Sequence, residues 1–137
     1  PSRFLPFANL YRQAQDELGR EPMPLGVHSP GHIAASDAEA RDQLWPHFEA
    51  NRNRIGAERG WPRTTRAEFE HEADTGSLYV GSVETVAQRI ASTVRTLGAD
   101  RFDLKYANGT MPHEQLLSSI ELYGREVIPR VRELLAG

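Results

Sequence analysis

Residues 80–106, VGSVETVAQRIASTVRTLGADRFDLKY, decide the fold class. Apolar residues recur at helical spacing from Val83 to Leu97, and Gly98 follows where a left-handed helix cap would lie. Residues 101–106 then alternate in the manner of a β-strand. A helix that leads directly into a strand is typical of βαβ units, so this stretch predicts an α/β protein with parallel strands.

The sequence on both sides continues this alternation. We expect helices over residues 6–18, 37–55, 65–72 and 112–135, a strand over 25–35 and a short strand at 78–80. Ser29-Pro30-Gly31 should interrupt the strand, Pro46 should bend or interrupt its helix, and Pro129 should kink the last helix. Ser36 with Glu39, and Thr65 with Glu68, form two predicted capping boxes.

The predicted sheet is too small to be complete. Two main strands make a poor parallel sheet, because such strands are normally covered on both faces and flanked by neighbours. The chain also opens at Pro1 without a methionine and runs almost at once into a helical pattern. We therefore expect the remaining strands to come from sequence upstream of this chain.

Composition limits the functional classes. The 137 residues suffice for one domain, and a net charge of −3 from 16 basic and 19 acidic residues offers no basic stripe for nucleic acid. The absence of cysteine excludes disulfides and thiolate sites, and the five histidines lack metal-ligand spacing. No apolar run reaches the roughly 18 residues of a membrane span. We expect a cytoplasmic protein without metal, membrane or nucleic-acid partners.

Three segments together resemble the luciferase-like flavin-dependent monooxygenases. Val80-Gly81-Ser82-Val83-Glu84-Thr85-Val86 is similar to the family's G-[ST]-P-E-x-V helix opening, with Val83 in place of its usual proline. Residues 97–102 are similar to the turn that follows this helix, and residues 107–110 and 126–129 are similar to the family's closing segments. The resemblance covers almost the whole chain and implies the C-terminal fragment of a (βα)8 TIM barrel, a single partial domain over residues 1–137.

On such a barrel, residues 25–35 would form strand seven and residues 102–106 strand eight. Residues 56–80 would be an insertion that acts as a mobile lid over the active site. The resemblance implies an oxidoreductase that uses reduced flavin, as FMN from a flavin reductase, and oxygen on a small organic substrate. A deazaflavin coenzyme is the alternative cofactor, and a non-catalytic partner-binding module is the alternative function.

Barrel enzymes place their chemistry at the carboxyl ends of strands. His28 is the candidate catalytic acid or base, and His32 and Tyr106 are candidates for the substrate pocket. Lys105 and Asn108 are candidates for binding the cofactor. A buried lysine in an apolar strand would need an anionic partner such as a flavin phosphate, although a structural ion pair would serve equally. Both histidines could instead be purely structural.

Two further candidates lie away from the strand ends. Gly81 and Ser82 begin a helix, where free N–H groups could bind the cofactor's phosphate, although a serine there is commonly an N-cap. Trp61 lies in a Gly/Pro-rich loop and could close a lid over the substrate. The fragment alone should be inactive, and its uncovered strands predict self-association or a complex with the missing barrel portion.

Overall fold

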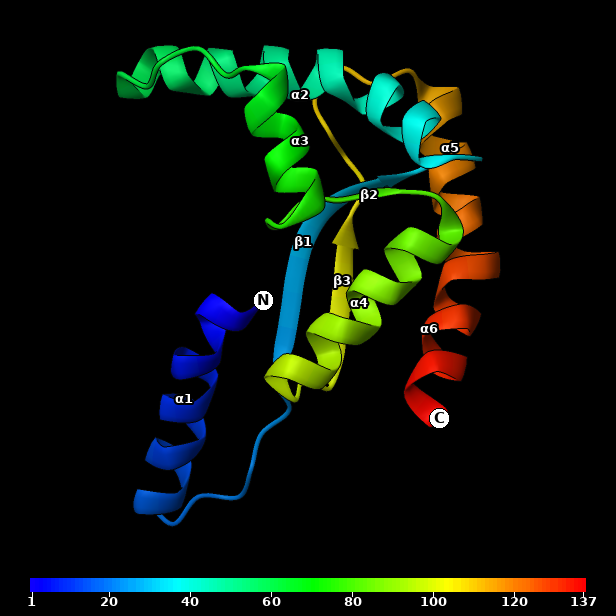
Figure 1. Ribbon diagram of the computed structural model, residues 1–137. Helices are drawn as coiled ribbons and strands as arrows, with labels where there is room; N and C mark the ends of the chain where they lie inside the picture. Colours follow the sequence, from blue (N-terminus) through cyan, green and yellow to red (C-terminus); the bar gives the residue numbers. More distant parts are fainter.

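The computed structural model describes residues 1–137 as a helix-rich α/β arrangement around a small sheet (Figure 1). The elements, in chain order, are a 3-10 helix η1 (Ser2–Phe4), α1 (Leu5–Glu17), β1 (Gly26–Ile33), α2 (Asp37–Arg59), α3 (Arg66–Asp74), β2 (Tyr79–Gly81), α4 (Val83–Leu97), β3 (Arg101–Lys105), α5 (His113–Leu122), a π-helical turn η2 (Tyr123–Val127) and α6 (Ile128–Ala136). No helix combines the length and apolarity that crossing a membrane requires.

The three strands are parallel, in the order β2-β1-β3. β1 pairs with β3 from Gly26 to Pro30 and then with β2 from Gly31 to Ile33. The predicted interruption at residues 29–31 was therefore wrong, and the stub at 78–80 is a true third strand. Although Pro30 has no N–H to donate, the strand continues because Gly31 takes up pairing on the opposite edge.

Gly31 is required by the close approach of both neighbours. A Cβ atom at this position would lie 2.3 Å from the Tyr79 carbonyl oxygen and 2.5 Å from Leu104 Cδ1. Real Cβ atoms do not tolerate such distances, and one of the two obstacles is backbone. The sheet can form in this register only if residue 31 lacks a side chain.

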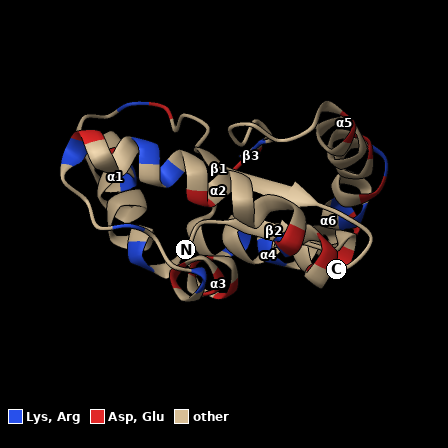
Figure 2. Cartoon of the chain, turned by 90° about the horizontal axis from the view of Figure 1, so that it is seen from above, with Lys and Arg blue, Asp and Glu red and all other residues tan.

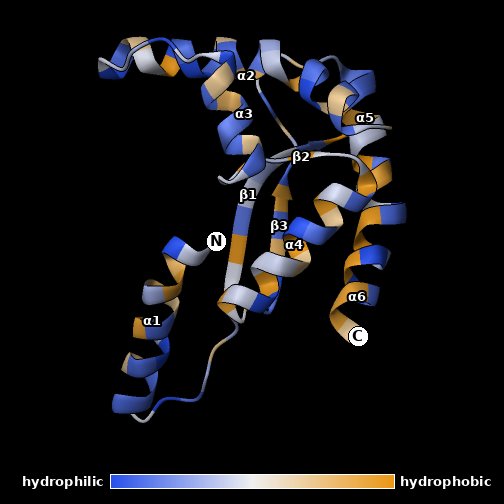
Figure 3. Ribbon diagram, in the orientation of Figure 1, coloured by the Kyte–Doolittle hydropathy of each residue, from blue (hydrophilic) through white to orange (hydrophobic).

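The helices α4 and α6 cover one face of the sheet (Figures 1 and 3). Ile33 of β1 and Tyr79 of β2 are buried there against α4, with Phe102 and Leu104 of β3 packed alongside. The Tyr79 hydroxyl forms a hydrogen bond of 2.7 Å with Thr93 Oγ1 of α4. This layer buries the alternate residues of each strand, as period-two patterning requires.

A second core lies at the carboxyl ends of the strands, where α2 and α3 pack together. Phe69 of α3 is fully buried between Trp45 and Phe48 of α2, with ring centroids 5.4 and 5.1 Å apart. Ala34 and Val80, at the ends of β1 and β2, complete this cluster. The segment 56–80, predicted as a lid, thus contributes a helix and a strand to the core.

The helix boundaries differ from the predictions at the prolines. α2 passes through Pro46 without a break and ends at Gly60, whose φ is 69°. Pro46 is exposed, so the carbonyl group left without a donor by the proline ring can turn to solvent. In the last helical region a π-helical turn directly precedes Pro129, which is where a kink was predicted.

Only one of the two predicted capping boxes is complete. Thr65 accepts a hydrogen bond from the Glu68 amide at 3.2 Å, and Glu68 accepts one from the Thr65 amide at 2.8 Å. Ser36 accepts from the Glu39 amide at 3.1 Å, but the Glu39 carboxylate accepts from Gln43 Nε2 instead of returning the bond. The prediction at Ser36 was therefore half wrong, because a side chain one turn along the helix competes for the carboxylate.

Replacing Gly31 by alanine should destabilise the fold by about 1–3 kcal/mol or more, because the added methyl group must push β2 away from β1. The matched control is Gly26→Ala in the same strand, where the nearest atom to the new Cβ is 4.0 Å away. Denaturant unfolding of both variants measures the difference. Equal midpoints would show that the β1–β2 pairing does not depend on Gly31.

Candidate functional site

The face of the sheet opposite α4 and α6 is polar and uncovered (Figure 2). Since Phe102 and Leu104 face the helices, the alternate residues Arg101, Asp103 and Lys105 of β3 face the other way. His28 of β1 is exposed on this same face. In a closed barrel this surface would face the interior.

The strand register places His28 directly opposite Asp103. Asp103 is held by Arg101, whose Nε lies 2.9 Å from Asp103 Oδ2. His28 therefore has a carboxylate-bearing residue as its neighbour across the strand pair. Sequence reasoning missed Asp103, although the alternation of charged and apolar residues over 101–105 marks these positions as one face.

Lys105 is the only lysine of the chain and lies at the carboxyl end of β3, opposite Pro30 in the register. It is exposed, which corrects the expectation of a buried ammonium group, because β3 alternates and residue 105 shares the polar face. It forms no ion pair in the structure, unlike Arg101 on the same strand. Lys105 is thus a free cation at the end of the strand where barrel enzymes bind their ligands.

His32 is fully buried, in contrast to His28. Its Nε2 lies 2.7 Å from Gln43 Oε1, and Gln43 Nε2 donates to the Glu39 carboxylate at 2.9 Å. This chain of bonds fixes the amide, so Nε2 of His32 carries the proton and the buried Nδ1 has no partner. Burial is the main cause that lowers the His32 pKa. Burial therefore favours the neutral form of His32.

The predicted anion site at the start of α4 contains a carboxylate of the chain itself. The amide of Ser82 donates to Asp37 Oδ1 at 2.7 Å, and the Thr85 hydroxyl donates to Asp37 Oδ2 at 3.0 Å. The Ser82 hydroxyl caps the helix by accepting from the Thr85 amide at 3.3 Å. Asp37 thus takes the place that a cofactor phosphate at Gly81 and Ser82 would need.

Of the remaining predicted residues, Asn108 and Tyr106 lie together after β3, and Trp61 lies apart from them. Asn108 Nδ2 donates to the carbonyl oxygens of Gly31 and Tyr106, both at 2.9 Å, and so fastens the end of β3 to β1. Tyr106 is exposed beside it. Trp61 follows α2, with the guanidinium carbons of Arg52 and Arg59 lying 5.0 and 5.2 Å from its ring centroid. Among the predicted residues, only His28 and Lys105 share the polar face of the sheet.

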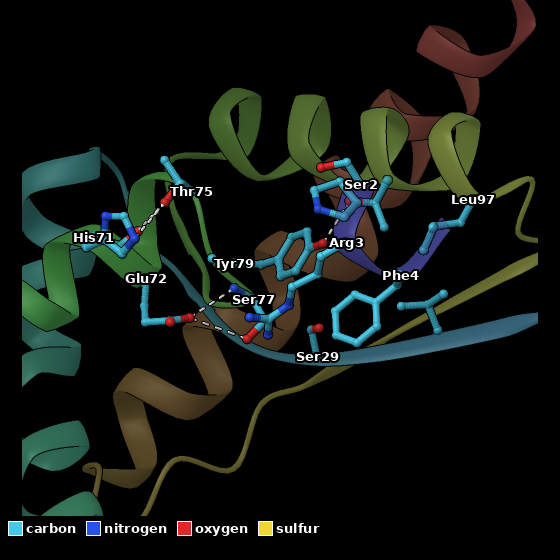
Figure 4. Close-up of a pocket in the computed structure, with 14 residues that line it drawn as sticks. Ser2, Arg3, Phe4, Ser29, His71, Glu72, Thr75, Ser77, Tyr79 and Leu97 are labelled. Atoms are coloured by element: carbon cyan, nitrogen blue, oxygen red, sulfur yellow. Dashed lines mark hydrogen bonds between the residues drawn. The ribbon is translucent and has the colours of Figure 1, made fainter. Parts of the chain in front are cut away.

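A cavity of about 700 Å³ lies between α2, α3 and the end of β1. Pro30 and Leu78 contribute from the sheet side, and Phe48 and Arg52 contribute from α2. A smaller cavity of about 180 Å³ adjoins it between η1 and α4 (Figure 4). The two cavities share four lining residues, namely Arg3, His71, Glu72 and Ser77.

The loop between α3 and β2, which borders both cavities, is held by Arg89 of α4. The Arg89 guanidinium donates to the carbonyl oxygens of Ala73, Gly76 and Leu78, the last two at 2.8 and 2.7 Å. A cation here also complements the negative end of the α3 dipole. No group of three or more His, Asp or Glu side chains is arranged to hold a metal ion.

Comparisons with known structures define the fold. No protein-family model and no curated protein matches the sequence. The monooxygenase RslO1 from Streptomyces bottropensis matches 94% of this chain with a TM-score of 0.76 and 20% identity. The oxygenating constituent of 3,6-diketocamphane monooxygenase from Pseudomonas putida, a type II Baeyer-Villiger enzyme in complex with FMN, matches 90% with a TM-score of 0.61 and 20% identity. The chain has the fold of part of these monooxygenases.

The chain spans 38% of the length of each of these two monooxygenases. The fold resemblance seen in the sequence is thereby confirmed, as is the prediction that the chain matches a fragment of a larger structure. In that setting further strands of the larger fold would pair at the edges of the sheet, and the uncovered face of β1 and β3 would be directed to the interior. The polar residues on this face then become candidates for lining a shared interior.

Removing the Asp37 carboxylate should open the α4 N-terminus. The hydrogen bond that the carboxylate accepts from the Ser82 amide is the main cause that lowers the Asp37 pKa. The ionised carboxylate therefore stabilises the fold fully above the ordinary carboxyl pKa, and this stabilisation is lost as the pH falls through the lowered pKa. We expect Asp37→Asn to reduce the free energy of unfolding at neutral pH by about 1 kcal/mol. The variant should also lose less stability than the unaltered protein as the pH is lowered. Thermal melts of both proteins across acidic pH measure this. If both proteins lose stability equally at acidic pH, Asp37 does not stabilise the start of α4 in this way.

Arg89→Met should cost about 2–4 kcal/mol, because it leaves three carbonyl groups without their charged donor. The matched control is Gln88→Met on the same helix, whose side chain bonds only to Glu84 at the surface. Hydrogen exchange of residues 75–78 should increase in the first variant alone. Equal exchange in both variants would show that Arg89 does not hold this loop.

Proposed function

We propose that this chain is the strand-seven and strand-eight portion of a luciferase-like flavin-dependent monooxygenase. The observation that carries the proposal is the fold shared with two monooxygenases, one of them in complex with FMN. The reaction proposed is oxidation of an organic substrate by oxygen with reduced FMN as cofactor. The chain supplies the rim of the pocket, and the activity requires the rest of the fold.

An anionic group of the cofactor fits beside Lys105 but not at the N-terminus of α4. Lys105 is an unpaired cation at the end of β3, within the uncovered polar face. A flavin phosphate or an anionic flavin ring edge would complete its charge pairing. The N-terminus of α4 does not fit, because the Asp37 carboxylate would repel a phosphate at Ser82. We therefore assign the cofactor contact to Lys105, with Asn108 holding the loop that follows it.

The polar face also supplies a proton-transfer group. When bound, the reduced flavin supplies the electrons that activate oxygen. His28 is placed on the polar face to hold or transfer a proton at the substrate, with Asp103 opposite it in the strand register. His32 is buried and bonded to Gln43, so its role is to fix the start of α2 against β1 beneath the pocket.

Uncovered surfaces support a partner in the assembled protein. Phe7 and Leu10 of α1, and Leu18 directly after it, are 62–69% exposed, which is unusual for large apolar side chains on one short segment. A groove between α4, α6 and β3 is likewise lined mainly by apolar residues. We propose that a second copy or the remainder of the barrel covers these surfaces, and that a flavin reductase supplies the reduced cofactor.

Flavin binding by the purified protein tests the assignment. FMN titration followed by flavin fluorescence should give saturable binding, and Lys105→Met should weaken it by about tenfold through loss of one charge-assisted contact. Arg125→Met, at a distant surface ion pair with Glu121, is the control and should bind normally. Absence of FMN binding would remove the proposed function. Equal weakening by both variants would remove only the role of Lys105.

A further inference from the structure

The larger cavity combines an apolar wall with a cationic edge. Phe48, Pro30 and Leu78 line one part of it, and Arg52 of α2 lines another. Its volume of about 700 Å³ lies within the range of sites for small organic molecules, roughly 300–1,000 Å³. A ligand that matches this lining has an apolar body and one anionic group.

Arg52 is exposed, lies over the Trp61 ring and forms no ion pair. Its guanidinium carbon lies 5.0 Å from the centroid of the Trp61 ring, a cation–π contact that does not use the N–H donors. No carboxylate oxygen lies within ion-pair distance of Arg52, whereas Arg41 of α2 and Arg66 of α3 are paired. Arg52 thus lines the cavity with a guanidinium whose N–H donors no carboxylate accepts from.

The carboxylates that line the same cavity are already engaged. Glu68 Oε2 accepts from the Thr65 amide at 2.8 Å and from the Thr64 hydroxyl at 3.1 Å. Glu72 Oε2 accepts from the Ser77 amide at 3.1 Å. Both acidic side chains serve as local caps for the backbone and neither forms an ion pair with Arg52, although the charges of Glu68 and Arg52 interact. Arg3 adds a second cation to the lining and is likewise unpaired.

We propose that this cavity is the substrate site and that it selects an organic carboxylate, whose carboxyl group pairs with Arg52 and whose ring lies against Phe48, Pro30 and Leu78. The inference rests on the proposed function and names its substrate class. A single stacked guanidinium offers one bidentate fork, which a carboxylate fills completely. The doubly charged phosphate of FMN requires more donors than this edge provides.

Sequence reasoning placed the substrate pocket at Trp61, His32 and Tyr106. Trp61 acts only indirectly in the structure. Its ring contacts the guanidinium of Arg52, and Trp61 does not itself line the cavity. The position of Arg52 one turn after Phe48 on α2 puts the charge and the aromatic wall on the same side of the helix. Arg52 is therefore a specificity-determining residue and Trp61 a positioning residue.

Matched ligands test the charge requirement. Calorimetric titration of the purified protein with naphthoate and with the neutral naphthamide should show binding about tenfold tighter for the carboxylate. Arg52→Gln should abolish this preference, and Arg52→Lys should restore only part of it, because lysine lacks the fork. Equal binding of the two ligands to the unaltered protein would overturn the proposal.

Arg59→Gln is the matched control. Arg59 lies two turns further along α2 and also stacks on Trp61, but it does not line the cavity. This variant should keep the preference for naphthoate, and if it loses the preference as fully as Arg52→Gln, the Arg52 assignment is overturned. Thermal melts of every variant establish that each is folded.

Parallel titrations with FMN and riboflavin separate the substrate site from the cofactor site. If Arg52→Gln removes a preference for FMN over riboflavin, the fork binds the flavin phosphate and the substrate assignment is overturned. If naphthoate binds as expected while FMN does not bind at all, the carboxylate site stands and the flavin-dependent function fails. Binding of both ligands, with only naphthoate sensitive to Arg52, supports both proposals.

Discussion

The arrangement of the strands depends on a glycine, which has no side chain, at position 31. At this residue β1 exchanges one partner for another, and Tyr79 and Leu104 approach the same backbone position from β2 and β3. The pairing with β2 fixes where α3 ends and where α4 begins, because both helices adjoin this short strand. Both cavities are bordered by the segment between α3 and β2, so their shape follows from this pairing.

The two faces of the sheet serve different purposes because the strands alternate. Phe102 and Leu104 join the core beneath α4, whereas Asp103 and Lys105 are directed away from it. If the fold ended with this sheet, such a polar face would be solvated. Both monooxygenases that share the fold are much longer, so the same face can meet further strands and enclose a ligand. The charged side chains of β3 would then lie in an interior that they share with the further strands.

Local sequence patterns predicted the local structure well. The stripe from Val83 to Leu97 gave α4 with its glycine cap, and Thr65 with Glu68 formed the expected capping box. Contacts between distant residues were not predictable in this way. Nothing near Ser82 in the sequence indicates that Asp37 accepts a hydrogen bond from its amide, and Ser29-Pro30-Gly31 is typical of a turn unless the partners on both edges are known. The sequence also did not reveal Asp103 as the neighbour of His28.

The packing of α2 against α3 changes how a lid over the site can work. Phe69 is fully buried between two aromatic rings of α2, and Arg41 and Arg66 form ion pairs with acidic residues across the two helices. The buried aromatic contacts dominate this interface, since exposed ion pairs add little. The two helices must therefore move together if they move at all. Because α2 continues through Pro46, such a motion would carry Phe48 and Arg52 as one rigid wall, and it would open or close the cavity without altering the alignment of its aromatic and cationic groups.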